Sequence, residues 1–226
     1  GIEGTEHVSI AQKFYIDPIK NLSIETYGTL FFMNSYDLIQ DMTFTQSRDF
    51  MTGFKAKYDV KDWFSVHLSM HADFYDRFKR HERLDERKKV YKSCILEPRL
   101  TVTSNYFNHH SLIFGIEHTS DELTSDRFVN RKMTTRALHE TEYFLQDEWI
   151  PNTHWLLSTG VRTNFSKAFG FMWMPKLAAK YSLNNHWAFR ANYSMGYRAP
   201  SIKELFFNWD HLGMFQIRGN EELRPE

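Results

Sequence analysis

The chain has 226 residues, of which 28 are Lys or Arg and 28 are Asp or Glu, so it carries no formal net charge. This balance argues against nucleic acid as a general partner, because phosphate binding requires a surplus of basic residues. The single cysteine, Cys94, excludes a disulfide scaffold and a cysteine-based zinc site. Aromatic residues make up 16% of the chain and charged residues 25%, so apolar and polar residues must alternate along it.

Alternation with a period of two residues is the dominant pattern, and it predicts β-strands with two different faces. It is first clear at residues 22–32 and strongest at residues 64–75, where Leu68 and its same-parity neighbours oppose His67 and His71. It returns at residues 155–165, where Leu157 opposes Arg162, and at residues 187–194, where Phe189 opposes Arg190. No run approaches the roughly 18 apolar residues of a transmembrane helix, so a helical membrane protein is excluded.

Turn-forming residues divide these strands into hairpins. Short turns are predicted at residues 17–18, 60–62, 105–108, 151–153 and 183–185. Longer polar connections are predicted at residues 37–42, 79–89, 120–132 and 166–170. We therefore expect about ten strands, most of them longer than the five or six residues usual in soluble sheets. Short turns at one rim and longer charged loops at the other are typical of outer-membrane β-barrels.

The tryptophans support a barrel independently. Four of them lie within two residues of a predicted short turn: Trp63, Trp149, Trp155 and Trp187. Because tryptophan concentrates at the membrane–water interface, this row is typical of an aromatic girdle, here at the periplasmic rim. A soluble β-sandwich would not sort tryptophan to one end. The predicted fold class is all-β, as part of a transmembrane antiparallel β-barrel.

Signals for catalysis are weak. The sequence contains no Gly-x-Ser-x-Gly elbow and no phosphate-binding glycine loop. His67 and His71 would lie about 13 Å apart along a strand, too far to bind one metal ion. We interpret them as polar side chains of the lumen, and the charged run at residues 85–89 as the solvated apex of a loop.

Several motifs follow one another in the C-terminal half. They are Gln-Asp-Glu-Trp at 146–149, Gly-Val-Arg at 160–162, Pro-Lys-Leu at 175–177, Gly-Tyr-Arg-Ala-Pro at 196–200 and Leu-Arg-Pro-Glu at 223–226. In this order they resemble the TonB-dependent outer-membrane receptors, in the form found in Bacteroidetes-like receptors. The resemblance covers roughly residues 112–226, and residues 1–111 match in strand pattern alone. A one-turn helix is expected after Pro200.

The resemblance implies a 22-strand barrel with an N-terminal plug. Residues 1–226 would supply about ten of these strands, with residues 199–226 as an extracellular loop segment and no plug domain. Because Gly1–Gly4 lacks the basic and apolar regions of a signal peptide, we expect a piece of a longer protein. The implied function is binding of a scarce nutrient and its import across the outer membrane of a Gram-negative cell. The implied partners are TonB, engaged through the missing N-terminal part, outer-membrane lipid, a small metal chelate and a surface lipoprotein.

Haem receptors of this family resemble the chain in one further detail. Tyr197-Arg198-Ala199-Pro200 matches their first box, Asn220 and Leu223 keep the ends of their second, and His211 lies between the two. The resemblance implies that His211 is an axial ligand of haem iron. The candidate ligand-binding residues are thus His211, Tyr197, Arg198 and Phe215, and His211 is also the candidate metal ligand.

Haem would be the transported ligand and not an intrinsic cofactor, and a corrinoid or a ferric siderophore is an open alternative to it. Two further classes of protein compete with the receptor. One is a ten-stranded outer-membrane barrel enzyme, although no catalytic residue is predicted. The other is a soluble β-sheet binding module.

Overall fold

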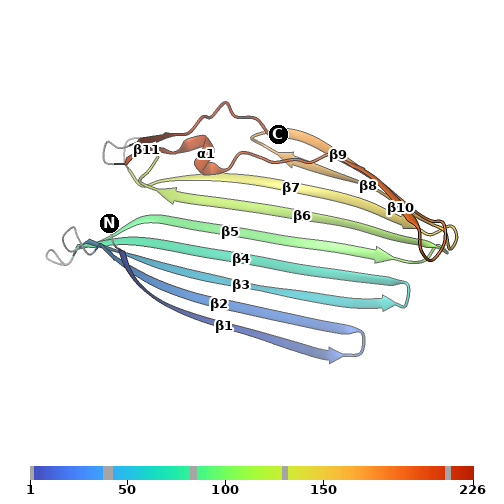
Figure 1. Cartoon of the computed structure of the whole chain (residues 1–226). Coiled ribbons are helices and arrows are strands. Elements are labelled where there is room, and N and C mark those ends of the chain that lie inside the picture. Colours follow the sequence, from blue (N-terminus) through green and yellow to red (C-terminus); the bar gives the residue numbers. More distant parts are fainter. Residues whose placement is uncertain (1–2, 38–42, 82–85, 129–131, 212–214) are drawn as a thin grey trace.

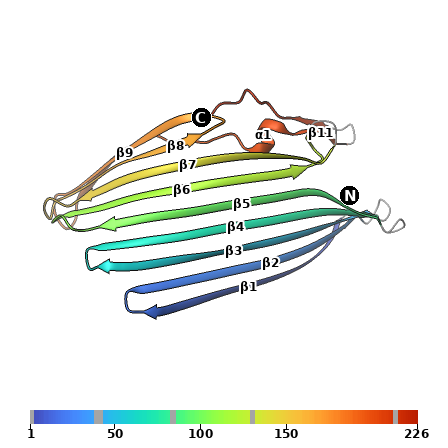
Figure 2. The same ribbon diagram turned by 180° about the vertical axis from the view of Figure 1, so that it is seen from behind.

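A computed structural model describes residues 3–37, 43–81, 86–128, 132–211 and 215–226, and ten strands of this chain form one antiparallel sheet (Figures 1 and 2). Neighbours in sequence are neighbours in space throughout, in the order β1 to β10. The strands are β1 Glu3–Ile19, β2 Leu22–Asp37, β3 Thr43–Lys61, β4 Phe64–His81, β5 Glu86–Ser104, β6 His110–Ser125, β7 Thr134–Trp149, β8 Trp155–Ser166, β9 Gly170–Ser182 and β10 Ala188–Ser194. The prediction of about ten antiparallel strands is confirmed.

One face of the sheet is apolar. Strand register fixes its members, because residues that pair across strands point to the same side. Leu68 of β4 lies opposite Ala56 of β3 and Leu100 of β5, and Leu100 lies opposite Ile116 of β6. Large side chains exposed on this apolar face include Leu30, Phe32, Phe50, Leu68, Phe74, Leu100, Phe114, Leu145, Val161, Leu177 and Phe189.

The opposite face is polar and carries cross-strand ion pairs. Glu25 accepts from Lys13 at 3.0 Å and lies 3.5 Å from Lys55, so three adjacent strands share one carboxylate. Further along the sheet, Arg162 lies 3.1 Å from Glu142. His67, His71, Arg162 and Arg190 all fall on this polar face, as their parity predicts.

The predicted turn at residues 17–18 is wrong by about two residues. Strand β1 continues through Pro18 to Ile19, and the turn consists of Lys20 and Asn21, with Asn21 in the left-handed region at a φ of 71°. The register shifts between Ile16 and Ile19. Such an irregularity in the outermost strand of this sheet tolerates a proline, whose missing N–H need not enter a ladder.

The other short turns lie close to their predicted positions. Strand β3 extends through Lys61, which moves the turn predicted at 60–62 to Asp62 and Trp63. Connections at residues 105–109, 150–154 and 183–187 contain the three remaining predicted turns.

The predicted long connections are mostly strand. Strand β4 continues to His81 and β5 starts at Glu86, so the predicted loop at 79–89, with its charged apex at 85–89, is wrong. Strand β6 likewise continues to Ser125, into the predicted connection at 120–132. Residues 166–170 form a tight turn, with Ser166 paired to Gly170. The predicted connection at 37–42 lies, apart from Asp37, outside the described residues.

Strand length explains these errors. A membrane span requires about 9–11 strand residues, whereas β3 and β5 each have 19. At a rise of about 3.3 Å per residue such a strand is about 60 Å long. Its end beyond the apolar region is hydrated on both faces, so alternation disappears there while backbone pairing continues.

The four tryptophans lie at the end of the sheet with the short turns, as predicted. Trp63 is in the β3–β4 turn, Trp149 ends β7, Trp155 starts β8, and Trp187 precedes β10. The Trp155 ring packs on Tyr181, with a centroid separation of 4.7 Å. This aromatic row marks one border of the apolar face.

The C-terminal arm, which we define as residues 195–226, folds back at the other end of the sheet (Figure 1). It contains the short helix α1 Ile202–Phe206, which confirms the expected one-turn helix, and the hairpin of β11 Asn208–His211 and β12 Phe215–Arg218. No helix in the described ranges is long and apolar enough to cross a membrane.

A small core fixes the arm to the sheet. Phe128, Ile202 and Phe207 are buried together with Leu123 of β6, and Phe128 and Phe207 meet edge to face at 5.5 Å. Leu123 pairs with Arg136 on the polar face, so the arm covers that face.

Candidate functional site

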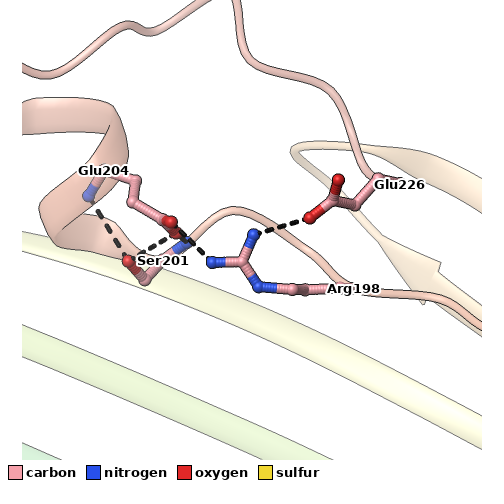
Figure 3. Close-up of polar contacts among 4 residues, drawn as sticks. All are labelled: Arg198, Ser201, Glu204 and Glu226. Atoms are coloured by element: carbon pink, nitrogen blue, oxygen red, sulfur yellow. Dashed lines mark hydrogen bonds and ion pairs between the residues drawn. The ribbon is translucent and has the colours of Figure 1, made fainter.

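The Gly-Tyr-Arg-Ala-Pro motif begins where β10 ends. Arg198 donates its backbone N–H to the carbonyl of Glu226 at 2.8 Å and accepts from the Glu226 N–H at 3.1 Å. Its side chain lies between two carboxylates (Figure 3), with Nη2 at 2.5 Å from Glu204 and Nη1 at 2.9 Å from Glu226. Arg198 therefore connects three parts of the arm: its start, helix α1 and Glu226.

Helix α1 is held by a reciprocal cap. The backbone N–H of Glu204 donates to Ser201 Oγ at 3.3 Å, and the Ser201 N–H and Oγ–H both donate to Glu204 Oε2, at 2.8 and 2.9 Å. Such a capping box satisfies N–H groups that the first helical turn leaves unpaired. The carboxylate of Glu204 thus serves both the helix and Arg198.

These hydrogen bonds favour the charged forms of the Glu204 carboxylate and the Arg198 guanidinium. The Ser201 donors and the Arg198 guanidinium lower the pKa of Glu204 to about 2. The Glu204 and Glu226 carboxylates raise the pKa of Arg198. Both groups remain ionised at neutral pH, so the pair persists there.

The Glu204 contact should therefore be lost in acid. A carboxyl whose pKa is lowered on folding stabilises the fold above its ordinary pKa of 4.5, and this contribution disappears as pH falls toward 2. At pH 7 we expect faster amide hydrogen exchange at residues 202–206 in Glu204→Gln than in wild type. The difference should shrink between about pH 4.5 and 2. A difference that is unchanged at pH 2 would contradict the assigned role of this carboxylate.

Gly219 allows the end of the arm to approach the helix. A Cβ atom at this position would lie 2.5 Å from the backbone carbonyl of Leu205, closer than real contacts allow. The Gly219 N–H donates to the backbone carbonyl of Phe207. The Asn220 N–H donates to the backbone carbonyl of Glu204 at 2.9 Å. Asn220 also accepts from the Glu222 N–H at 2.9 Å, which gives this motif residue a role in the turn.

Tyr197 points toward the polar face of the sheet. Burial and the carboxylates of Glu140 and Glu142 raise its pKa to about 12. Its hydroxyl therefore stays protonated at physiological pH and can act as a hydrogen-bond donor.

His211 and Phe215 lie at the tip of the β11–β12 hairpin, where their backbones pair directly. Their side chains lie outside the described residues, so the candidate haem ligand and its aromatic neighbour are placed by backbone position alone. Among the described residues no three His, Cys, Asp or Glu side chains gather as a metal-binding group.

A groove of 920 Å³ adjoins the arm, and sequence reasoning did not identify it. Its lining combines apolar and charged residues from β7, the β8–β9 turn, β9 and the arm: Leu138, Phe169, Met172, Phe206, Glu221 and Arg224. These segments are far apart in sequence, and none of them carries a pattern that points to the others. The groove offers apolar cover and both signs of charge to a ligand at this end of the sheet.

Similarity to known proteins defines the class of protein to which this chain belongs. The family described as "TonB dependent receptor-like, beta-barrel" matches residues 11–226. The chain therefore belongs to the β-barrel of the TonB-dependent receptors. It is 25% identical over 169 residues to the iron-regulated outer membrane virulence protein of Vibrio cholerae, a match that covers 73% of this chain and 24% of that protein.

Solved receptors share the fold. The siderophore receptor PirA of Acinetobacter baumannii superimposes with a TM-score of 0.76 at 12% identity, over 100% of this chain and 40% of that one. A mutant of the ferric enterobactin receptor PfeA of Pseudomonas aeruginosa gives 0.79 at 13% identity, over 100% and 39%. The chain thus spans about a quarter of the curated relative and about two fifths of the solved receptors.

Membership of this family assigns an environment to each face of the sheet. The protein is in the outer membrane of a Gram-negative cell, its apolar face meets lipid, and its polar face lines the lumen. The family consists of receptors, so the alternatives of a barrel enzyme and of a soluble binding module are set aside.

Proposed function

We propose that the complete protein is an outer-membrane receptor that binds a small iron chelate at the cell surface and imports it with energy supplied through TonB. The observation that carries this proposal is the family match over residues 11–226. The iron-regulated relative and the siderophore receptors of the same fold favour an iron chelate over other nutrients.

The C-terminal arm is the part of this chain that we propose to contact the chelate. It lies at the end of the barrel opposite the short turns, and the short turns of such barrels face the periplasm. The exposed guanidinium of Arg198 supplies N–H donors for the oxygen atoms of a chelate. The adjoining groove supplies apolar cover.

Binding to the purified full-length receptor tests this proposal. Ferric catecholate, ferric hydroxamate, haemin and cyanocobalamin are titrated separately, and tryptophan fluorescence reports binding. We expect one of the three iron compounds to bind with saturation. Saturable binding of cyanocobalamin alone, or of none of the four, would contradict an iron receptor.

Haem is the specific candidate that His211 favours. With haemin as the chelate, we expect His211→Ala to reduce or abolish the Soret shift, because an axial bond to iron is lost. Phe215→Ala should weaken binding more moderately through loss of aromatic cover. His186→Ala is the control, since His186 lies in the β9–β10 connection at the opposite end. An unchanged shift in His211→Ala would remove this residue as the ligand.

A further inference from the structure

The Gln-Asp-Glu-Trp motif places one carboxylate, that of Asp147, on the face that meets lipid. Asp147 pairs with Leu112 of β6 and Thr159 of β8, and it has the parity of Leu145 on the apolar face. From the row of Leu68 to the short turns, it is the only Asp, Glu, Lys or Arg at the described outward strand positions of β4 to β10. A charge that faces lipid is costly, and ionisable residues in such positions are usually functional.

Two aromatic side chains accompany this carboxylate. His110 Nδ1 lies 2.8 Å from Asp147 Oδ2, and the His110 ring stacks on Trp149 at a centroid separation of 5.4 Å and an interplanar angle of 6°. A neutral imidazole can donate this hydrogen bond and leave the carboxylate negative. Asp147 Oδ1 is covered and has no hydrogen-bond partner in the part of the chain that the structure describes. The side chain of Asp147 is still 27% exposed, so a donor from the lipid side can approach Oδ2.

These three residues, which we call the headgroup site, lie at the periplasmic border of the apolar face. Strand β6 begins at His110 and β7 ends at Trp149, next to the short turns. Lipid headgroups of the periplasmic leaflet lie at this level, where tryptophan concentrates. A carboxylate beside an exposed tryptophan ring suits an ammonium group, which gains charge-assisted hydrogen bonds from the carboxylate and a cation–π contact from the ring.

An apolar groove of 410 Å³ begins beside the headgroup site. Its outward lining comes from β8, β9 and β10: Leu157, Thr159, Leu177, Ala179, Ala191 and Tyr193. Trp149 pairs with Leu157 of the lining. Asp147 pairs with Thr159, two residues further along the same strand. The register therefore makes the groove continuous with the headgroup site on one face of the sheet.

The groove extends toward the interior of the membrane. Its low part is formed by Ala179 and Ala191, which pair on adjacent strands. On these two strands the apolar face continues for one more row toward the turns, with Tyr181 and Phe189. The groove is thus further from the periplasmic border than Asp147. A lipid whose headgroup lies at Asp147 has room for an acyl chain over β8 to β10.

We propose that the headgroup site and the groove bind one phospholipid of the periplasmic leaflet whose headgroup carries a primary ammonium, as in phosphatidylethanolamine. The ammonium donates to Asp147 and lies against Trp149, and an acyl chain occupies the groove. The groove is continuous with the lipid-facing surface, and the charge of Asp147 disfavours an anionic headgroup. This inference rests on the outer-membrane location and not on the identity of the imported chelate.

The motif itself provides a matched control. Glu148 follows Asp147 in the chain, is half-buried like it, and pairs with Ser111 and Ser158 on the lumen face. Asp147→Asn and Glu148→Gln each remove one carboxylate charge with almost no change of shape. The two variants differ in the face on which the charge is lost.

The test uses purified, delipidated full-length receptor in detergent, and native mass spectrometry measures the affinity for the first bound lipid. Phosphatidylethanolamine and phosphatidylglycerol with the same acyl chains are titrated separately. We expect wild type to bind phosphatidylethanolamine about tenfold more tightly, the contribution of a hydrogen bond between charged groups. Asp147→Asn should bind the two lipids within about twofold of each other, and Glu148→Gln should keep the wild-type preference. Ala179→Leu, which fills the groove, should weaken both lipids at least about fourfold, the contribution of one buried CH₂ group.

Equal affinity of wild type for the two lipids would overturn the proposal, and this comparison gives an answer even if a variant does not fold. A preference that survives in Asp147→Asn, or that is lost equally in Glu148→Gln, would overturn it as well. Unchanged affinities in Ala179→Leu would contradict an acyl chain in the groove. Free ethanolamine at equal concentration should not compete, because it lacks the acyl chains, and effective competition would reassign the headgroup site to a soluble amine.

Discussion

Leu68→Arg is expected to destabilise the inserted barrel by about 2–4 kcal/mol, whereas His67→Arg should cost much less. Leu68 lies in the middle of the apolar face, between Ala56 and Leu100. A guanidinium at this position would be moved into hydrocarbon. His67 is its neighbour in sequence but lies on the lumen face, where an arginine keeps contact with water.

Urea unfolding of the full-length receptor in phospholipid bilayers measures this difference. The two variants place the same side chain at the same height and differ in the face they occupy. Equal destabilisation by both, or a larger loss for His67→Arg, would contradict the assignment of lipid and lumen faces.

Phe128→Ala is expected to release the C-terminal arm from the sheet. Phe128 is 1% exposed and packs against Ile202 and Phe207, so its truncation leaves a cavity in the small core. Removing a buried phenylalanine side chain costs about 3–5 kcal/mol. Because the rest of this core is small, we expect the loss to appear as local unfolding of the arm while the barrel stays folded.

Hydrogen exchange in the full-length receptor detects this local change. Amides of residues 202–207 should exchange about a hundredfold faster in Phe128→Ala, and those of the central strands at the wild-type rate. Tyr106→Ala is the control, since Tyr106 is 62% exposed at the opposite end of the sheet. Protection of the arm that survives in Phe128→Ala would show that polar contacts such as Arg198–Glu204 hold it without this core.

Much of the sheet could be predicted from the sequence, because its determinants are local. Alternation at residues 64–75 directly reflects the two faces of β4, and the register places Leu68 and His67 as their parity predicts. The positions of the four tryptophans likewise predicted which end of the sheet carries the short turns. Errors arose where alternation stops at the membrane border, since the charged ends of β4 and β5 pair through their backbones and carry no periodic signal.

The arm could be predicted only in part. The motif at 196–200 and the one-turn helix after it were visible in the sequence. The contacts of Arg198 with Glu204 and Glu226 depend on how the chain folds back, and so does the packing of Ile202 on Phe128. The groove next to the arm combines β7, β9 and the last residues of the chain. No local pattern encodes such a combination.

Uptake of radioactive iron by living cells tests the central claim most directly. Iron-starved cells receive ⁵⁵Fe in the chelate that the purified receptor binds, in wild type, in a strain lacking this protein and in a strain lacking TonB. We expect loss of uptake in both mutant strains, with surface binding lost in the strain without the receptor and retained in the strain without TonB. Uptake of that chelate at the wild-type rate in either mutant strain would contradict a TonB-driven importer.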